Sequence, residues 1–354
     1  MKPTSFWIGA VALACALAAS SLAIAGETKG PHGETATPAA SLMLTPEEEA
    51  KIKAGNFTAA LAWHTQSDYT AAVDQGANDE FKRLGISVVA EANAGFDAAK
   101  QKSDVETILA RKPNIILSLP VDPDTAPEVY RPAIEAGVVL GFVDNAPKGF
   151  EQGRDYATIV SDDLFQMGAK AADAMAAAIG NKGKVGYLFH DASFYVTNQR
   201  DQAFKETIQT KYKDIAIVAD QGLADPTRGE DVINAFMLKH PDIDAVYVTW
   251  AEPAEFVLAA LRNNGNTHTR VVTLDLSEPL ALDMVKGGNV AAIVADEAYG
   301  IGATLARATA AKLLNKDLAP YYAVGAIAIT KDNLKEGWFQ SLHRDPPASL
   351  TGAQ

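Results

Sequence analysis

Polar and aromatic side chains follow several strand-like segments of this sequence, at points where they could bind a small polar molecule. In the first half of the chain these residues are His64, Asp68, Tyr69, Asp144 and Asn145. In the second half they are Arg200, Trp250, Asp275 and Asp296. Carboxylates and arginine make paired hydrogen bonds with adjacent hydroxyl groups, and aromatic rings cover the apolar face of a pyranose or furanose. These residue types therefore favour a site for a sugar-like ligand.

Each of these residues also has a purely structural interpretation. Asp at the end of a strand often caps the next helix, and Tyr69 and Trp250 could be packing residues. Four aspartates are expected at one edge of the fold: Asp68, Asp144, Asp275 and Asp296. Their number favours ligand binding over capping. His64 and His190 could bind a metal ion with neighbouring aspartates, but no HxxxH or HxH spacing supports this, so we expect no metal and no cofactor.

Sequence motifs typical of catalysis are missing. The chain has no GxSxG elbow, no GxxxxGK[ST] phosphate loop and, apart from Cys15, no cysteine. Gly300-Ile301-Gly302 has no third glycine in the dinucleotide-binding position, and we interpret it as close helix packing. We therefore expect no enzymatic activity. The alternative is an exported hydrolase that uses Asp144 and Asp275 as acid and base.

The elements that must position these residues alternate regularly from Asn56 onward. Short β-branched runs, such as Asn114–Leu119 and Val138–Asp144, alternate with segments of helical spacing. This alternation predicts an α/β fold with doubly wound parallel sheets, in which ligands bind beyond the carboxyl ends of the strands. Phe142-Val143-Asp144 and Thr273-Leu274-Asp275 end the fourth strand of each half, which indicates a structural repeat.

A break in the alternation after Asp144, through Pro147, Gly149 and Gly153, predicts a crossing between two lobes. We expect an N-terminal lobe from residues 55–160 and 296–323, and a C-terminal lobe from residues 161–295 and 324–335. Three hinge segments would join them, near residues 158–161, 294–296 and 322–325. Residues 336–354 would form a C-terminal tail.

The N-terminal region has the features of an export signal. One lysine, Lys2, precedes a long apolar run that closes on Ala23-Ile24-Ala25, a pattern that signal peptidase cleaves, so we expect residues 1–25 to be removed. A membrane anchor, or a lipid attached at Cys15, is the alternative. Residues 26–45 are rich in Gly, Pro, Ala and Thr, and we expect a tether with little order. Thr45-Pro46-Glu47-Glu48 then predicts the start of a short helix that closes the 26–54 region.

The formal net charge of −13 excludes two classes of partner. Binding to nucleic acid or to an anionic membrane requires clustered lysine and arginine, which an acidic chain of this composition does not offer. Roughly 300 residues of folded chain are more than one ordinary core needs, which again favours two lobes. We expect a monomer that binds a small molecule.

From about Phe57 to Thr330 the chain resembles the periplasmic sugar-binding proteins of the ribose-binding type. The segments that carry the resemblance are Gln75-Gly76-Ala77, Leu84-Gly85, Gly141-Phe142-Val143-Asp144, Arg200-Asp201-Gln202-Ala203-Phe204, His240-Pro241-Asp242-Ile243-Asp244-Ala245-Val246 and Val271-Val272-Thr273-Leu274-Asp275. The resemblance implies a hinged type I periplasmic binding protein fold, a sugar ligand, a periplasmic location, and an ABC permease with its ATPase as partners. Repressors of the same fold carry an N-terminal DNA-binding motif, whereas this chain carries an export signal.

By position, the resemblance places ligand contacts at Ser67, Tyr69, Asp144, Asn145, Arg200, Ala224, Trp250, Asp275 and Asp296. Several of these depart from the ribose-binding pattern: Asn145 stands for an arginine, Ala224 for an aromatic residue, Trp250 for an asparagine and Asp296 for a glutamine. These departures make the site more acidic, so a sugar or polyol other than ribose is the expected ligand. A cationic or amine-bearing solute stays open as an alternative, and so does the role of a sensor subunit that presents its ligand to a chemoreceptor or kinase.

Overall fold

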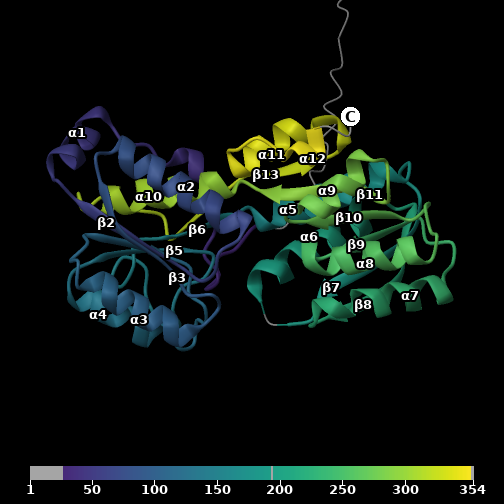
Figure 1. Ribbon diagram of the computed structural model, residues 1–354, viewed down its shortest axis with the longest axis horizontal. Helices are drawn as coiled ribbons and strands as arrows, with labels where there is room; N and C mark the ends of the chain where they lie inside the picture. The colour runs from purple at the N-terminus through teal and green to yellow at the C-terminus, as the bar shows by residue number, and fades with distance from the viewer. Residues whose placement is uncertain (1–26, 193, 352–354) are drawn as a thin grey trace, which may run out of the picture.

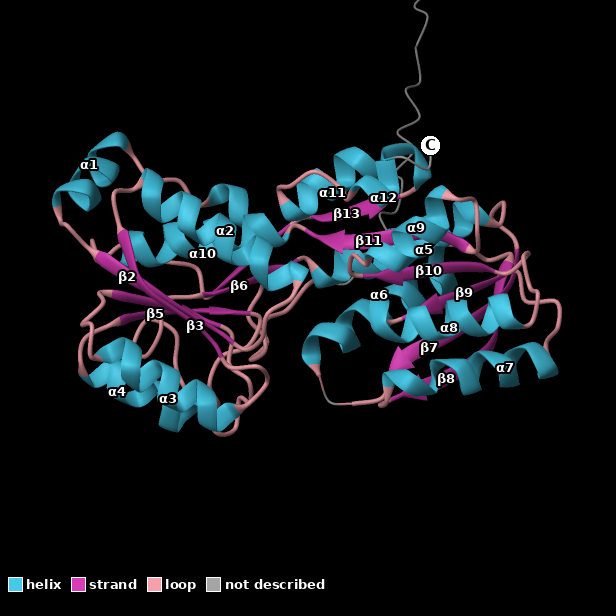
Figure 2. Cartoon of the chain, viewed as in Figure 1, coloured by secondary structure: helices cyan, strands magenta, loops and turns pink. Residues whose placement is uncertain are grey.

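The computed structural model describes residues 27–192 and 194–351, which form two α/β lobes side by side (Figure 1). The expected export signal, residues 1–25, lies outside the described residues. In each lobe a central sheet carries helices on both faces (Figure 2). The predicted architecture of two doubly wound lobes is therefore confirmed. No helix within the described residues is long and apolar enough to cross a membrane.

The sheet of the N-terminal lobe has the strand order β1-β12-β6-β5-β4-β2-β3, and all its neighbouring strands are parallel. Its strands are β1 (Thr37–Pro38), β2 (Thr58–Trp63), β3 (Ser87–Asn93), β4 (Ile115–Ser118), β5 (Val139–Val143), β6 (Ile159–Asp162) and β12 (Tyr321–Val324). Helices α2 (Asp68–Arg83) and α10 (Ala298–Lys312) cover one face, and α3 (Ala98–Leu109) and α4 (Ala126–Glu135) cover the other. Strands such as β4 are buried on both sides, which explains their continuous apolar sequence.

The sheet of the C-terminal lobe has the order β13-β11-β10-β9-β7-β8. Its strands are β7 (Gly183–His190), β8 (Ile215–Leu223), β9 (Ala245–Val248), β10 (Arg270–Leu274), β11 (Val290–Asp296) and β13 (Ala326–Ile329). The covering helices are α5 (Leu164–Ala178) and α6 (Tyr195–Lys211) on one face, and α7 (Gly229–Lys239), α8 (Ala251–Asn263) and α9 (Glu278–Val285) on the other. Strand β13 is antiparallel to β11, so this sheet has one antiparallel edge that the alternating pattern did not predict.

The chain crosses between the lobes at three places. It passes from β6 to α5 at residues 162–163, from β11 to α10 at residues 296–298, and from β12 to β13 at residues 324–326. Because each crossing follows the carboxyl end of a strand, the strand ends of both lobes face the same interlobe region.

The segment after the expected export signal differs from its prediction. Residues 27–45 are ordered, so the prediction of a loose tether is wrong for them. Thr28 bonds to Asp163 at the start of α5, and strand β1 extends the N-terminal sheet by pairing Thr37 with Tyr322. We call residues 27–38 the N-terminal strap, because they bond to both lobes. The long-range strand pairing, which composition does not reveal, supplies the order.

The predicted short helix after Thr45 is present, whereas the predicted C-terminal tail is not. Helix α1 (Pro46–Ala54) begins with the predicted Thr45 cap, whose side chain and that of Glu48 form a reciprocal capping box. Residues 336–351, in contrast, do not project as a tail. They form most of α11 (Leu334–Leu342) and all of α12 (Ala348–Thr351), and they bury Trp338 and Leu350 against the lobes.

Candidate functional site between the two lobes

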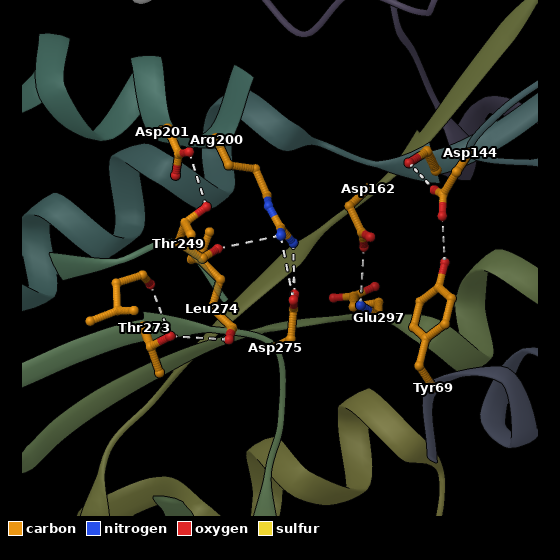
Figure 3. Close-up of polar contacts among 12 residues, drawn as sticks. Tyr69, Asp144, Asp162, Arg200, Asp201, Thr249, Thr273, Leu274, Asp275 and Glu297 are labelled. Atoms are coloured by element: carbon orange, nitrogen blue, oxygen red, sulfur yellow. Dashed lines mark hydrogen bonds and ion pairs between the residues drawn. The ribbon is translucent and has the colours of Figure 1, made fainter. Parts of the chain in front are cut away.

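Four aspartates meet where the two lobes join, each at the carboxyl end of a parallel strand. Asp144 follows β5 and Asp162 ends the neighbouring strand β6, whereas Asp275 follows β10 and Asp296 ends the neighbouring strand β11. Arg200 of α6 is the cationic residue among them (Figure 3). We call these five residues the interlobe cluster. Each lobe contributes one pair of adjacent strands, so the cluster depends on both lobes.

Arg200 and Asp275 form a paired hydrogen bond within the C-terminal lobe. Arg200 Nη1 donates to Asp275 Oδ1 at 2.7 Å and Nη2 donates to Asp275 Oδ2 at 3.4 Å. Arg200 is only 4% exposed. Burial acts to lower the pKa of this guanidinium, but Asp275 and Asp296 outweigh burial and keep the pKa above its ordinary value. The cation is therefore permanently charged and held in a fixed position, with its fork directed at the interlobe face.

A buried network behind Arg200 holds the local backbone. Asp201 accepts hydrogen bonds from the Tyr247 hydroxyl at 2.7 Å, the Thr249 hydroxyl at 3.0 Å and the His190 amide at 2.8 Å. Burial raises the pKa of Asp201, and these hydrogen bonds act in the opposite direction. The network joins α6 to β7 and β9, and it therefore fixes the start of the helix that carries Arg200.

Asp144 is the corresponding carboxylate of the N-terminal lobe. Ser161 Oγ donates to its Oδ1 at 2.5 Å, and the Tyr69 hydroxyl donates to its Oδ2 at 3.2 Å. The Tyr195 hydroxyl of the opposite lobe donates to the Asp144 carbonyl oxygen, which links the two lobes beside the cluster. Burial raises the pKa of the Asp144 carboxyl, although Ser161 and Tyr69 both oppose this. Tyr69 therefore serves here as a hydrogen-bond donor to Asp144.

Asp162 and Asp296 form a carboxyl pair across the hinge. The two side chains share a hydrogen bond, and Asp162 also accepts the Glu297 amide at 3.3 Å. Burial, Asp296 and Asp144 raise the pKa of Asp162 well above its ordinary value. Burial and the charge of Asp275 raise the pKa of Asp296 to about 7. A hydrogen bond between two carboxyl groups requires one proton, so the pair holds a proton near neutral pH.

Aromatic rings gather at one strand end in each lobe. In the C-terminal lobe, the rings of Trp250 and His190 meet edge to face with centroids 4.9 Å apart. In the N-terminal lobe, His64 meets the exposed ring of Phe96 at 5.1 Å. Burial lowers the pKa of His64 to about 4, so this imidazole is neutral at physiological pH. Neutral aromatic surfaces of this kind cover the apolar face of a polyhydroxylated ring.

Some predicted residues lie outside the interlobe cluster. Asp68 forms an ion pair with Arg344, at 2.7 Å, and its side chain is 57% exposed. Ser67 caps α2 and exchanges hydrogen bonds with Thr70. Ala224 lies exposed beyond the end of β8, in a hollow lined also by Asp191 and Arg228. The prediction that Asp68 lies with the other three aspartates is therefore wrong, and Asp162 takes its place.

Asn145 is buried directly after Asp144. Its backbone amide bonds to the Val143 carbonyl oxygen at 2.6 Å in the tight turn that ends β5.

Asp162 was not among the residues predicted from the sequence. The signal was present, because Ile159-Val160-Ser161-Asp162 ends a short apolar run on an aspartate, as do the segments before Asp144 and Asp275. The sequence analysis places this stretch in a crossing between the lobes, whereas the structure has it as strand β6 of the sheet. The sequence analysis does not predict Ser161 and Tyr195 as partners of Asp144, because the residues around them in the sequence do not indicate this contact.

Within residues 27–192 and 194–351, no group of three or more His, Cys, Asp or Glu side chains is arranged to hold a metal ion. His190 instead hydrogen-bonds the Thr197 hydroxyl through Nδ1 at 2.7 Å. The cluster offers one fixed cation, several carboxylates and nearby hydroxyl and aromatic groups, which together suit a small polar ligand held between two lobes.

These features define a class of two-lobed α/β protein in which both lobes contribute polar side chains to one cluster at the hinge. The chain belongs to the family described as periplasmic binding protein domain, which matches residues 23–317.

Individual relatives agree with this assignment. The ribose import binding protein of Salmonella typhimurium is 26% identical over 269 residues, which are 76% of this chain and 88% of that protein. The ribose import binding protein of Bacillus subtilis is 28% identical over 265 residues, covering 73% and 84% of the two chains. A putative rhizopine-binding protein of Rhizobium meliloti is 25% identical over 232 residues, covering 64% and 74%.

Solved structures share the fold. An arabinose-binding protein from Geobacillus stearothermophilus superposes with a TM-score of 0.71 at 21% identity, covering 79% of this chain and 99% of that one. A solute-binding protein from Agrobacterium radiobacter, in complex with D-arabinose, gives a TM-score of 0.65 at 24% identity and covers 82% and 99%. One from Bacillus halodurans with bound myo-inositol gives 0.64 at 18% identity and covers 80% and 98%.

Proposed function

We propose that this protein binds a small polyhydroxylated solute, a sugar or polyol, between its lobes and delivers it to an ABC importer from the periplasm. The observation that carries the proposal is the interlobe cluster, in which Arg200 and Asp275 of one lobe face Asp144 of the other. A ligand that bonds to both lobes stabilises the closed arrangement, because it contacts both faces only there.

The chemistry of the cluster supports a ligand with several hydroxyl groups. Carboxylates accept hydrogen bonds from two neighbouring hydroxyls, and the guanidinium donates to their oxygens. The Trp250 indole, which contacts the His190 ring edge to face, adds an apolar surface from the second lobe. Ribose is disfavoured, because the site has more acidic groups than the ribose-binding pattern implies.

The relatives support the transport role. Five of the curated relatives that match with 25–28% identity are ribose import binding proteins from different bacteria, and one further relative is a D-apiose import binding protein. Import proteins of this kind work with a membrane permease and its ATPase. The N-terminal sequence, with its apolar run and Ala-x-Ala end, supports export to the periplasm.

The test is a binding screen on the mature chain, beginning at Gly26. We would measure thermal shifts and then calorimetry with pentoses, hexoses, polyols and inositols. We expect at least one compound to raise the melting temperature, and Asp275→Ala to abolish that shift. Ligand should also reduce the radius of gyration measured by small-angle X-ray scattering, because the lobes close. A screen in which no polyhydroxylated compound binds the folded protein contradicts the proposal.

A further inference from the structure

The charges of the interlobe cluster do not balance. Asp144, Asp162, Asp275 and Asp296 face one guanidinium, and that cation is already paired with Asp275. Among the ion pairs of residues 27–192 and 194–351, none involves Asp144, Asp162 or Asp296 with a lysine, arginine or histidine. Asp162 is only 4% exposed, and a carboxylate buried to that extent is costly without a partner. The cluster therefore lacks a positive charge.

The shortage is localised at the Asp162–Asp296 pair. Asp144 has Ser161 and Tyr69 as hydrogen-bond donors, and Asp275 has Arg200. Among the described residues, the Asp162 carboxylate receives one long hydrogen bond, from the Glu297 amide, and the two carboxyls otherwise bond to each other.

The charges that act most strongly on the pair come from several elements. Asp144 from β5, Asp275 from β10 and Arg200 from α6 act on it through their charges. Glu297 follows Asp296 directly, and its carboxylate accepts a hydrogen bond from Gln340 at 2.8 Å. Three of these four groups are negative, so they oppose ionisation of the pair and favour the shared proton.

A second and independent observation points to a ligand. Nε of Arg200 is buried, and it has no hydrogen-bond partner within the described residues, although both terminal nitrogens of the guanidinium are bonded. A buried donor without a partner destabilises the folded protein, because it has lost its hydrogen bonds to water. A ligand oxygen would satisfy it. The cluster therefore needs a hydrogen-bond acceptor beside Arg200 and a cation beside Asp162 and Asp296.

We propose that the ligand is an aminated polyol or amino sugar, whose ammonium group binds between Asp162 and Asp296 while one of its hydroxyl oxygens accepts from Arg200 Nε. This inference rests on the proposed function and names the substrate class of the same site. An ammonium group has three N–H donors, so it can bond to both carboxylates at once. It thereby replaces the proton that the pair shares in the free protein, and that proton passes to the solvent.

The pH dependence of binding has a defined sign. The carboxyl pair must lose its proton before an ammonium group can bind between the two carboxylates. Because burial and Asp275 raise the pKa of Asp296 to about 7, the affinity for an aminated ligand should increase as the pH rises from 5.5 to 7.5. A neutral polyol can accept a hydrogen bond from the protonated pair, so its affinity should be unchanged or should fall over the same range.

The experiment compares matched pairs of probes by isothermal titration calorimetry on the mature chain. The pairs are D-glucose with D-glucosamine, D-galactose with D-galactosamine, and scyllo-inositol with its mono-amino derivative. Titrations in buffers of different ionisation enthalpy give the number of protons released. We expect an aminated member to bind at least tenfold more tightly than its neutral counterpart at pH 7, and to release up to one proton.

Variants locate the effect. Asp296→Asn and Asp162→Asn remove one charge each with little change of shape, and both should reduce the preference for the amine by tenfold or more. Asp332→Asn is the matched control, since Asp332 is an exposed carboxylate remote from the cluster and should leave the preference unchanged. The melting temperature of each variant shows whether it is folded, and either of the two cluster variants is sufficient.

The outcomes separate this inference from the proposed function. If neutral polyols bind and their aminated counterparts bind no more tightly, or bind without releasing a proton, the inference is overturned and the proposed function stands. If no compound of either kind binds to the folded protein, both are overturned. If only aminated members bind, and Asp296→Asn abolishes their binding, the inference is supported.

Discussion

Asp144 and Asp275 occupy equivalent positions in the two lobes and adopt the same unusual backbone conformation. Both have positive φ angles, 56° and 65°, in the left-handed region that few residues other than glycine and asparagine adopt. The Asp144 amide bonds to the Val160 carbonyl oxygen of the next strand, and the Asp275 amide bonds to that of Val294 in the same way. The repeat that the sequence indicated is therefore also a repeat of backbone geometry, which turns one carboxylate of each lobe toward the interface. Backbone strain of this kind often accompanies binding sites.

The paired hydrogen bond between Arg200 and Asp275 should dominate the stability of the C-terminal side of the site. Asp275→Ala should lower the free energy of unfolding by about 3–5 kcal/mol, because it leaves a buried guanidinium without its partner. Adding Arg200→Met should recover part of that loss, since it removes the unpaired charge. Urea denaturation of the two single variants and the double variant measures the coupling.

The exposed ion pair of Lys148 and Asp124 is a suitable control for this cycle. Lys148→Ala should leave the free energy of unfolding nearly unchanged, because solvent screens an exposed pair. If the Asp275→Ala/Arg200→Met double variant loses as much free energy of unfolding as the two single variants lose together, Arg200 and Asp275 do not interact.

Two glycines of helix α10 form a matched pair for a test of helix packing. A Cβ atom at Gly302 would lie 1.8 Å from the Val73 carbonyl oxygen of α2, whereas at Gly300 the nearest atom would be 3.6 Å away. The interpretation of this glycine pair as close helix packing is thus confirmed for Gly302. Gly302→Ala should lower the free energy of unfolding by about 1–3 kcal/mol or more through overpacking. Gly300→Ala should be neutral or stabilising, because alanine favours the helix. Equal melting temperatures of the two variants would contradict the close contact.

The N-terminal strap should stabilise the hinge side of the molecule. Gln199 on α6 makes two hydrogen bonds to the backbone of Lys29, at 2.8 and 2.7 Å. Gln199→Ala should therefore cost roughly 1–2 kcal/mol and speed up amide hydrogen exchange in residues 28–38. Gln209→Ala, an exposed position on the same helix, is the control and should leave exchange in the strap unchanged. Equal exchange in the two variants would show that these hydrogen bonds do not hold the strap.

His64 should make the protein less stable in mild acid. Burial lowers its pKa to about 4 in the folded protein, whereas in the unfolded chain it has its ordinary value near 6.5. Between these two pH values the unfolded state binds the extra proton, so stability falls as the pH decreases from 6.5 to 4. His64→Gln removes this titration. As the pH decreases from 6.5 to 4, the free energy of unfolding of His64→Gln should therefore rise relative to that of the natural protein by roughly 1–3 kcal/mol. Thermal denaturation at a series of pH values measures the difference, and a constant difference would contradict the shift.

The local pattern of residue types is sufficient to predict the fold class, the two lobes and most of the strands. Segments such as Asn114–Leu119 and Val138–Asp144 carry a local pattern of β-branched residues, and the structure has strands β4 and β5 within them. Asp144 and Asp275 could be found for the same reason, because a residue at the end of a parallel strand lies at the binding edge wherever that strand sits in the sheet.

Which of the acidic residues lie close together depends on the tertiary structure. Asp68 looked equivalent to the other aspartates in the sequence, but the folded C-terminal segment brings Arg344 to it. Asp162 pairs with Asp296 although 133 residues separate them along the chain, because the chain crosses the hinge after both β6 and β11. Order in residues 27–45 likewise comes from β12 and α6, which lie far away in the sequence. Long-range packing brings these partners together. A local pattern of residue types does not reveal which distant segments will pack against each other.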